Sequence, residues 1–396
     1  MKELLSSQVD RANSFYEEIL MLVHDDNNYD IVIAHETYCS GMAALKFCER
    51  SQHDIFKILD IVEYPVFSQR SSEQVRARGV NSSISDQLTL SFAVSVASKF
   101  DYLISTSEGQ RAVYREQNDS LEIDVIRNSR SGQAPNSEYL VSEVDSIRTM
   151  FSLSSSDIVM VYPNRVYSHG GIEACLNTLS KLPEHFKLVI VGDIVNELHE
   201  FVNSLAEDLQ LKSRFYVTGM LDPSLVLDFL TEADLALITL EPTIENHRKC
   251  LPNRVFDALE CGLPIICYDG TEISDFVRKY EVGCSIKYRG DSSFEDAVLH
   301  VLDNFMRLKR NASKVGLLHR WEYESLPLKR SIAQLLPNAR RALILAGKDI
   351  SRNDRIKRMI MSLKELDIRV DVVAKAPPMD SVRVSDVNYY YPKRTV

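Results

Sequence analysis

The hydrophobic positions of this chain form short continuous runs, and these alternate with longer stretches in which apolar residues recur at helical spacing. Short apolar runs are typical of strands that are buried on both faces of a parallel sheet, with helices as the connections between them. The pattern therefore predicts an α/β protein with parallel sheets. The expected strands are 30–34, 56–60, 102–106 and 123–126 in a first series, then 158–162, 188–191, 215–218, 235–239, 265–268 and 284–286 in a second.

A polar segment at 128–143, rich in Ser and Gly, divides the two series and predicts an interdomain linker, with the boundary near residue 150. A chain of 396 residues is also too long for one ordinary core and suits two domains. We therefore expect one domain at 1–150 and a second at 151–336.

The two ends of the chain are unusual. The first series opens with a helix at 14–23 and lacks a strand before it. After a helix near 327–336, a strand at 341–346, a helical stretch and a strand at 369–374 form a βαβ unit. Such a unit normally opens a Rossmann-type domain. Residues 338–396 therefore read as a displaced βαβ unit of a first domain.

Composition narrows the class of protein. A hydrophobic content of 45% with 26% charged residues is that of a globular chain. No apolar run approaches the roughly 20 residues that span a bilayer, and the first residues lack the apolar core of a secretory signal. The seven cysteines include no C-x-x-C pair, so we expect free thiols in a reducing compartment, a cytoplasmic location and no metal site.

The net charge of −10 is unevenly distributed. Residues 307–396 hold 20 Lys and Arg against 9 Asp and Glu, and the other 306 residues hold 26 against 47. A basic end suits an anionic membrane surface, phosphorylated ligands or nucleic acid, or is simply a solvated helix face. No nucleic-acid-binding motif accompanies it, so nucleic acid is not an expected partner.

The most informative stretch is 251–264, LPNRVFDALECGLP. Pro252 fixes φ at the start of a helix, and Gly262 ends that helix before the next apolar run. Free N–H groups at a helix N-terminus bind anions, and Asp257, about one turn in, can accept hydrogen bonds from sugar hydroxyls. This combination suits a nucleoside diphosphate with its ribose.

At this point the chain resembles the retaining GT-B glycosyltransferases of family 4. The strings VMVYPNRVYSHGG, KLVIVGD, RFYVTGM, TEADLALITL and LPNRVFDALECGLPII resemble the donor-binding domain of that family in order and spacing. YDIVIAHETYCSG resembles its acceptor-side domain, and ISRNDRIKRMIMSLKELDIRVDVV resembles the family's first βαβ unit, where an Asp-Arg pair precedes the helix. The resemblance implies two Rossmann-like domains facing across a cleft, with the nucleotide sugar held mainly by the second.

The displaced βαβ unit has two interpretations. A circular permutation would complete the first domain, with the strand at 341–346 beside the one at 30–34. A tandem or truncated protein would instead begin a second enzyme there and leave the first domain without its central strand. We favour the permutation.

The resemblance implies three catalytic residues in the donor-binding domain. Arg165 follows the first strand of that domain, where open α/β sheets bind ligands, and its guanidinium can clamp a diphosphate. His169 stands where the family usually has Lys, and a protonated imidazole would still bind phosphate. Asp257 takes the second acidic position of the family's paired-glutamate motif, while Lys249 occupies the first with reversed charge. For Arg165 and His169, an ordinary surface role is the alternative.

Further residues are expected to touch the donor. Asn246, Asn253 and Arg254 resemble an Asn…Leu-Pro-Asn-Lys loop found in some branches of the family. The full set of donor-binding candidates is Gly170, Gly171, Gly219, Met220, Asn253, Arg254, Gly347 and Lys348. Gly347 and Lys348 would form a βα loop, although Lys348 and Arg355 also read as ordinary surface cations.

On the acceptor side, KILDIVEYP resembles a family strand that ends in Asp, one residue, His, Glu. Asp60 and Glu63 keep the acids, and Val62 replaces the His. His35, at the end of the preceding strand, is the candidate substitute, with a structural histidine as the alternative. These three residues complete the predicted site.

We expect transfer of a sugar from a nucleoside-diphosphate sugar to a glycan or lipid-linked acceptor, with retention of configuration. The nucleotide sugar is a substrate, no cofactor is expected, and the basic end leaves peripheral contact with the inner face of a membrane open. The departures at His169, Lys249 and Val62 favour an alternative, a degenerate GT-B module that binds a nucleotide or a protein without catalysis. A sugar-nucleotide epimerase is a third reading.

Overall fold

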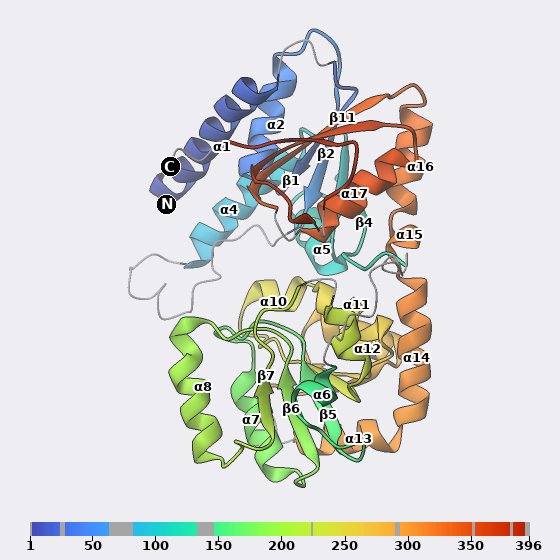
Figure 1. Ribbon diagram of the computed structural model, residues 1–396. Helices are drawn as coiled ribbons and strands as arrows, with labels where there is room; N and C mark the ends of the chain where they lie inside the picture. Colours follow the sequence, from blue (N-terminus) through green and yellow to red (C-terminus); the bar gives the residue numbers. More distant parts are fainter. Residues whose placement is uncertain are drawn as a thin grey trace. The chain divides into compact units, whose positions relative to one another are not determined.

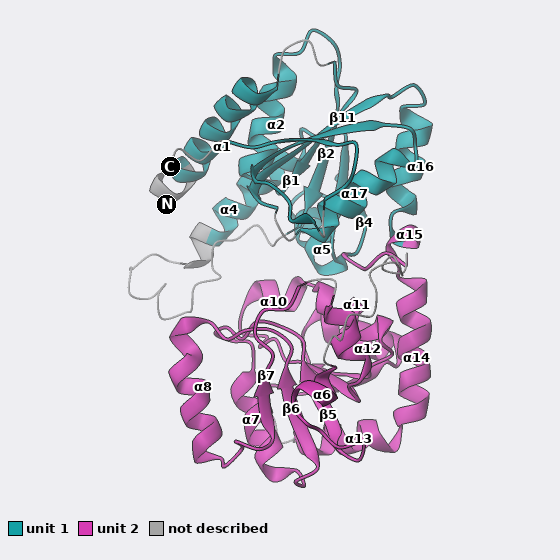
Figure 2. Cartoon of the chain, in the orientation of Figure 1, with its two compact units in different colours: residues 1–127, 324–396 teal, residues 128–323 magenta. Residues whose placement is uncertain are grey.

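The structure is a computed structural model, and it describes residues 2–23, 28–62, 82–132, 146–222, 225–289, 294–350, 353–380 and 383–392. The chain divides into two compact units (Figure 2). Unit 1 comprises Met1–Arg127 and Glu324–Val396, and unit 2 comprises Asn128–Tyr323. The displaced βαβ unit thus folds with the first segment of the chain.

The division falls at 127/128 and not near the expected residue 150. The first residues of the expected linker are held by unit 2. Trp321 N–H donates to the Arg130 carbonyl at 2.8 Å, and Gly132 N–H donates to the Glu322 carboxylate at 3.0 Å. The remainder of that linker lies mostly outside the described residues.

Unit 1 is built on a seven-stranded parallel sheet of order β13-β12-β11-β1-β2-β3-β4. Its strands are β1 (Ile31–His35), β2 (Phe56–Ile61), β3 (Tyr102–Ser105), β4 (Ile123–Val125), β11 (Arg341–Asp349), β12 (Arg369–Ala376) and β13 (Asn388–Tyr390). All five residues of β1 are buried, as the continuous apolar run predicted for a strand covered on both faces.

Strand β11 lies next to β1, as the permutation interpretation required. The two strands pair in parallel, with Ile31 opposite Ala342 and Ala34 opposite Leu345. If the strands are counted from β11, the sheet order reads 3-2-1-4-5-6-7, which extends the Rossmann order. The point at which that order reverses lies between β11 and β1, and this is where open α/β sheets bind ligands.

Helices cover both faces of the unit 1 sheet (Figure 1). Helix α1 (Lys2–Leu22) packs on α2 (Cys39–Glu49), which packs on β1 and β11. The other helices are α4 (Ser82–Ala97), α5 (Glu108–Gln117), α16 (Leu326–Leu335) and α17 (Asp354–Lys364). One core contains Phe15, Ile19, Val32, Leu59 and Leu343.

Unit 2 contains a six-stranded parallel sheet of order β10-β9-β8-β5-β6-β7. Its strands are β5 (Ile158–Tyr162), β6 (Phe186–Ile190), β7 (Phe215–Val217), β8 (Leu235–Ile238), β9 (Ile265–Tyr268) and β10 (Gly283–Ile286). Counted from β5, this is again the Rossmann order, and it reverses between β5 and β8. The loops that follow these two strands therefore mark the expected ligand edge.

Two cores fill unit 2, one on each side of the sheet. The helices are α6 (Ile147–Met150), α7 (Ile172–Lys181), α8 (Asn196–Asp208), α9 (Val226–Thr231), α10 (Glu245–Lys249), α11 (Asn253–Glu260), α12 (Glu272–Tyr280), α13 (Phe294–Asp303), α14 (Phe305–Leu318) and α15 (Trp321–Glu324), whose last residue belongs to unit 1. No helix among the described residues has the length and apolar character needed to cross a membrane.

The strands predicted from the apolar runs are all present, with ends that differ by at most three residues and with 158–162 and 265–268 matched at both ends. The first helix is much longer than the predicted 14–23, and Pro252 caps helix α11 from outside, so the helix begins at Asn253. The Asp354–Arg355 pair likewise lies within the first turn of α17, because Asn353 is its N-cap. The short edge strand β13 was not predicted.

Candidate functional site

The loop from β5 to α7 forms one wall of the unit 2 ligand edge. Tyr162 and Thr239 hydroxyls both donate to the Gly170 carbonyl, at 3.0 and 2.9 Å. Gly171 has φ +81° and caps α7, and a Cβ there would lie 2.3 Å from the Thr239 carbonyl oxygen. Only glycine fits this approach, so the predicted tight turn at Gly170 and Gly171 is present. The first-turn N–H groups of α7 lack helical acceptors and suit an anion.

His169 is held at this edge by a network that the sequence did not reveal. Its Nδ1 lies 3.1 Å from Glu241 Oε2, and the Tyr288 hydroxyl donates to that same oxygen at 3.1 Å. The backbone reinforces the pairing, since Glu241 N–H donates to the His169 carbonyl. Glu241 follows β8, the strand across the topological reversal from β5, so only the fold brings it to His169.

The two predicted arginines differ in their surroundings. Arg165 is 54% exposed, and its guanidinium lies 3.3 Å from Asp193. Arg254 lies in the first turn of α11 and has no hydrogen-bond or carboxylate partner among the described residues. Burial lowers the pKa of nearby His247, and the charges of Arg254 and His169 lower it further, although hydrogen bonding to the Glu241 carbonyl opposes this. Of the three predicted cations at this edge, Arg165 and His169 each lie beside a carboxylate, and only Arg254 lacks one among the described residues.

Two asparagines at this edge have buried polar atoms without a partner. Asn164 Nδ2 follows β5, and Asn246 Oδ1 lies in α10, and neither makes a hydrogen bond within the described structure. Leaving a buried polar group unpaired costs about 1–3 kcal/mol, so such atoms favour a site that a ligand completes. Asn164 was not predicted, and its place directly after β5 was the available signal.

Asp257 is less free than the sequence suggested. It lies buried in α11, and Arg130 Nε donates to its Oδ1 at 2.6 Å. A ribose hydroxyl would have to share this carboxylate with Arg130, a residue that sequence reasoning missed because 127 positions separate the two. Asn253, the first residue of α11, is exposed.

Gly219 and Met220 lie beyond β7, two strands away from β5. Gly219 has φ +74° with open space around a Cβ position, and Met220 is exposed. The predicted turn is therefore present, and its contact with a nucleotide base stays a prediction.

The ligand edge of unit 1 is built differently. His35 ends β1, and its Nδ1 lies 2.8 Å from Asp60 Oδ2, while its Nε2 lies 3.0 Å from Asn353 Nδ2. Arg355 donates to both Asp60 oxygens at 2.7–3.1 Å and to the Ile126 carbonyl at 2.9 Å. Asn353 Oδ1 in turn accepts from the first N–H groups of α17. We refer to His35, Asp60, Asn353 and Arg355 as the buried cluster.

The buried cluster settles two of the sequence alternatives. Arg355 is 2% exposed, so its reading as a surface cation is wrong. His35 is not a lone histidine, since both ring nitrogens have partners. Burial by itself raises the pKa of Asp60, but Arg355 and His35 outweigh it and hold that pKa below its ordinary value. Asp60 is therefore ionised and holds Arg355 and His35 in place. Glu63 lies outside the described residues.

Gly347 does not lie in a loop, because β11 continues through it to Asp349 with a register shift against β12. Its N–H donates to Ser40 Oγ at 2.8 Å, and a Cβ there would lie 2.5 Å from Cys39 Sγ. Gly347 therefore serves the close packing of β11 on α2. Lys348, also within β11, is half-buried and has a protein partner.

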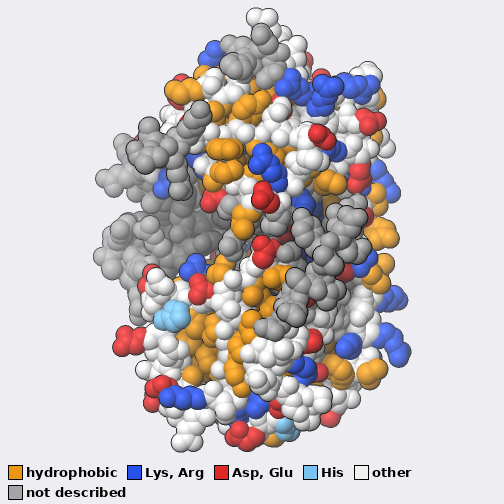
Figure 3. All heavy atoms as spheres, in the orientation of Figure 1, with side chains coloured by type: hydrophobic (Ala, Val, Ile, Leu, Met, Phe, Trp, Pro, Cys, Tyr) orange, Lys and Arg blue, Asp and Glu red, His pale blue; other side chains and the backbone are white. Residues whose placement is uncertain are grey.

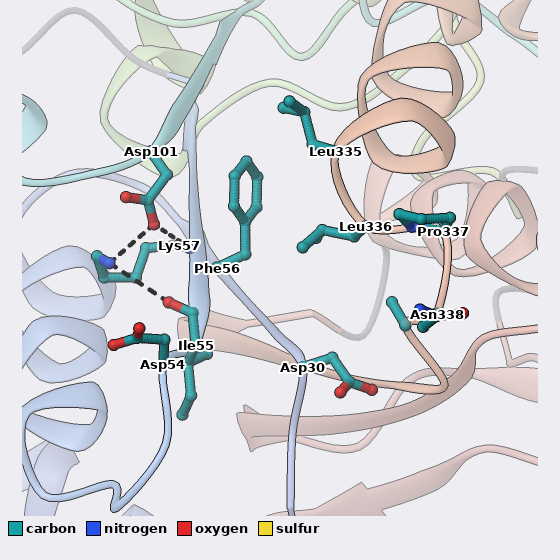
Figure 4. A pocket seen from close by; sticks show the side chains of 11 residues that line it. Asp30, Asp54, Ile55, Phe56, Lys57, Asp101, Leu335, Leu336, Pro337 and Asn338 are labelled. Atoms are coloured by element: carbon teal, nitrogen blue, oxygen red, sulfur yellow. Dashed lines mark hydrogen bonds and ion pairs between the residues drawn. The ribbon is translucent and has the colours of Figure 1, made fainter.

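An open pocket of about 620 Å³ lies at the opposite, amino end of the unit 1 sheet (Figure 4). Two of its three acids are already engaged: Asp30 accepts the N–H groups of Arg340 and Arg341, and Asp101 pairs with Lys57 at 2.8 Å, while the third, Asp54, is exposed. Lys57, the one cation among the lining residues, is therefore already paired, and the pocket has no free cation for a pyrophosphate. Among the described residues, no group of three or more His, Cys, Asp or Glu side chains is placed to hold a metal ion.

Comparison with known proteins agrees with this geometry. Residues 157–304 match the family model described as "Glycosyl transferases group 1". A search of curated protein sequences gives no match to the chain. The matched segment spans β5 to α13, and so contains the whole unit 2 edge described above.

Several solved structures share the fold. The sucrose-phosphate synthase of Thermosynechococcus elongatus aligns over 86% of this chain and 80% of its own, with 16% identity and a TM-score of 0.65. HepE of Anabaena, in complex with UDP, aligns over 83% and 82% with 13% identity and a TM-score of 0.59. A glycosyltransferase of Rickettsia africae aligns over 84% and 82% with 13% identity and a TM-score of 0.57.

The expected fold class is thereby confirmed: two parallel-sheet α/β domains of the GT-B type. The matched domain and the shared fold together support a GT-B glycosyltransferase.

Proposed function

We propose that this protein transfers a sugar from a nucleoside-diphosphate sugar to a glycan or lipid-linked acceptor, with retention of configuration. The observation that carries the proposal is the unit 2 ligand edge, where Arg254 lacks a described partner and the buried Asn164 Nδ2 is unpaired. A pyrophosphate offers the charge and the acceptors that these groups lack. Structures of HepE with UDP and with UDP-glucose show such a ligand in the same fold.

In this proposal, Arg165, Arg254, His169 and the N-terminus of α7 bind the pyrophosphate and stabilise the charge that develops on the leaving nucleotide. Asp257, shared with Arg130, and Asn253 place the ribose or the sugar. Gly219 and Met220 contact the base. Removing one such electrostatic contact typically slows a reaction by about 100- to 1000-fold.

The proposal includes three finer points. No metal or cofactor takes part, since arginines and helix N-termini neutralise the pyrophosphate, and EDTA should leave turnover unchanged. The reaction is cytoplasmic, in keeping with seven free cysteines. Unit 1, with His35 and Asp60 at its ligand edge, binds the acceptor substrate. Its strand order of 3-2-1-4-5-6-7, counted from β11, favours an origin of this chain by circular permutation.

The direct test incubates the protein with UDP-sugars and GDP-sugars and a pool of glycan and lipid-linked acceptors. Release of the nucleoside diphosphate that depends on acceptor supports transfer, and NMR of the product anomer tests retention. Arg165→Ala should weaken both binding and turnover. Donor binding that is undiminished by Arg165→Ala, with no turnover, would contradict the proposal.

The alternative function is a non-catalytic GT-B module that binds a nucleotide or a protein. One observation favours it: the carboxylate of Asp257 is already paired with Arg130. Tight nucleotide binding without release of product from any donor, in the presence of acceptors, would support this alternative.

A further inference from the structure

The solvent-facing side of α14 combines cations with large apolar side chains. The helix has 14 residues, with neither Asp nor Glu, although acids outnumber bases in the whole chain by 56 to 46. Its cations are Arg307, Lys309, Arg310 and Lys314. Met306, Leu317 and Leu318 are 70%, 49% and 59% exposed.

These residues, apart from the half-buried Lys309, share one side of the helix. At 3.6 residues per turn, the exposed positions fall within an arc of roughly 140°. Around that arc they follow the order Ser313, Met306, Leu317, Arg310, Lys314, Arg307 and Leu318. The opposite side is buried and packs closely, because a Cβ on Gly316 would lie 2.6 Å from the Leu259 carbonyl oxygen. The exposed face is therefore held rigidly on unit 2.

The charges of this face are mostly uncompensated. Arg310 and Lys314 have no acidic partner among the described residues, and only Arg307 forms an ion pair, with Glu281 at 3.2 Å. An ordinary solvated helix carries charges of both signs and few exposed large apolar residues. In Figure 3, Lys, Arg and hydrophobic side chains line the lower right edge, where Figure 1 shows α14.

We propose that the exposed face of α14 binds an anionic membrane surface. The cations lie among the headgroups, and Met306, Leu317 and Leu318 enter the boundary between headgroups and acyl chains. A nucleic acid would satisfy the cations and leave the apolar side chains without a partner. A second copy of α14 would bring like charges together. The inference does not depend on the proposed function, since binding to vesicles requires no turnover.

The test is co-sedimentation of the whole protein with vesicles of equal parts phosphatidylcholine and phosphatidylglycerol, and with vesicles of phosphatidylcholine alone. We expect binding to the anionic vesicles, weakened by salt, and little binding to the neutral ones. Arg310→Gln with Lys314→Gln should weaken binding on the order of 20-fold, since each cation near an anionic surface contributes roughly fivefold. Leu317→Ser with Leu318→Ser should weaken it on the order of tenfold.

The matched control is Lys181→Gln with Lys212→Gln, which removes the same charge from exposed positions elsewhere on unit 2 and should leave vesicle binding unchanged. Melting curves check that each variant is folded. If the variant Arg310→Gln with Lys314→Gln does not fold, the single variant Lys314→Gln takes its place, and it should weaken vesicle binding roughly fivefold. Three outcomes would overturn the inference: no vesicle binding by the unmutated protein, equal binding to neutral vesicles, or equal losses in the control. Loss of a dimer and not of vesicle binding in the leucine variant would assign the face to self-association instead.

Discussion

At the ligand edge of unit 1, every side-chain nitrogen and oxygen of His35, Asp60 and Arg355 has a protein partner. The same edge of unit 2 leaves Arg254 and Asn164 Nδ2 without one among the described residues. Both edges lie where a parallel sheet reverses its strand order, so topology alone does not separate them.

The difference lies in where the charge is placed. A charge that is fully buried must be paired, because its desolvation costs several kcal/mol, and the pair then acts as part of the scaffold. A partly exposed cation at a helix N-terminus tolerates the lack of a partner, since water solvates it, and it stays available to a ligand. One topology therefore supports a fully paired edge in unit 1 and, in unit 2, the edge that we propose binds the nucleotide sugar.

The largest expected effect comes from disrupting the buried cluster of unit 1. Arg355→Gln should lower the free energy of unfolding of unit 1 by about 3–5 kcal/mol, because Asp60 would stay buried without its partner. Hydrogen exchange of peptides from β1 and β2 measures this loss, since one global transition is not assured for two domains. Unchanged protection of β1 and β2 would show that the buried cluster does not stabilise unit 1.

Arg254→Gln should have the opposite effect, with a large loss of activity and little change in stability. We expect kcat/KM for the nucleotide sugar to fall about 100- to 1000-fold, because a cation at the pyrophosphate is lost. Stability should change by no more than about 0.5 kcal/mol, since the side chain holds no described partner. Arg248→Gln is the control, an arginine in α10 that pairs with Glu245, and it should keep nearly full activity. Equal losses for both arginines would contradict a special role for Arg254.

The two units should begin to lose stability at different pH values as the solution is acidified. The pKa values of His247 and Asp60 are both lowered in the folded protein, so each group contributes stability that is present above its unfolded pKa and lost as the pH falls below it. Protection in unit 2 should therefore begin to fall below about pH 6.5, and in unit 1 only below about pH 4. For Asp60 the loss is on the order of 2 kcal/mol, the usual scale for one paired carboxylate.

Hydrogen exchange at a series of pH values measures both steps. His247→Gln should remove the first step and Asp60→Asn the second, the latter with a lower starting stability. Loss of protection in unit 1 before unit 2 would contradict the assignment.

The smallest expected effect sharpens the role of His169. Glu241→Gln should lower kcat/KM by roughly tenfold, or about 1.4 kcal/mol, because the imidazole loses a charged partner that orients it. Tyr288→Phe, which removes only the hydroxyl that donates to Glu241, should cost less. No change in either variant, with His169→Ala impaired, would mean that His169 acts without this support.

The predictable part of the fold is the part with a strong local pattern. Strands buried on both faces need continuous apolar runs, so β1, β5 and β9 were visible, whereas the short edge strand β13 has no such run. Gly171 was predictable as a turn, because its positive φ excludes other residues. The pairing of β11 with β1 was inferred from what the first segment lacked.

Site residues were predicted less completely. Arg165, His169 and Arg254 follow the expected strands, and the sequence placed them at one edge. Glu241 and Tyr288 were missed, because their contact with His169 joins loops after different strands. Arg355 was read as a possible surface cation, since a charge pattern does not show which of several arginines faces a buried aspartate 295 positions away.

By itself, the sequence determined two parallel α/β units, their strands apart from β13, the glycine turn and the cations of the unit 2 edge, because these follow from local backbone preference and from apolar periodicity. Only the tertiary structure decided which charged side chains are paired within the protein and which lack a protein partner and could bind a ligand. That choice depends on burial and on partners distant in the chain, since the cost of a charge is set by what surrounds it and not by its neighbours in sequence.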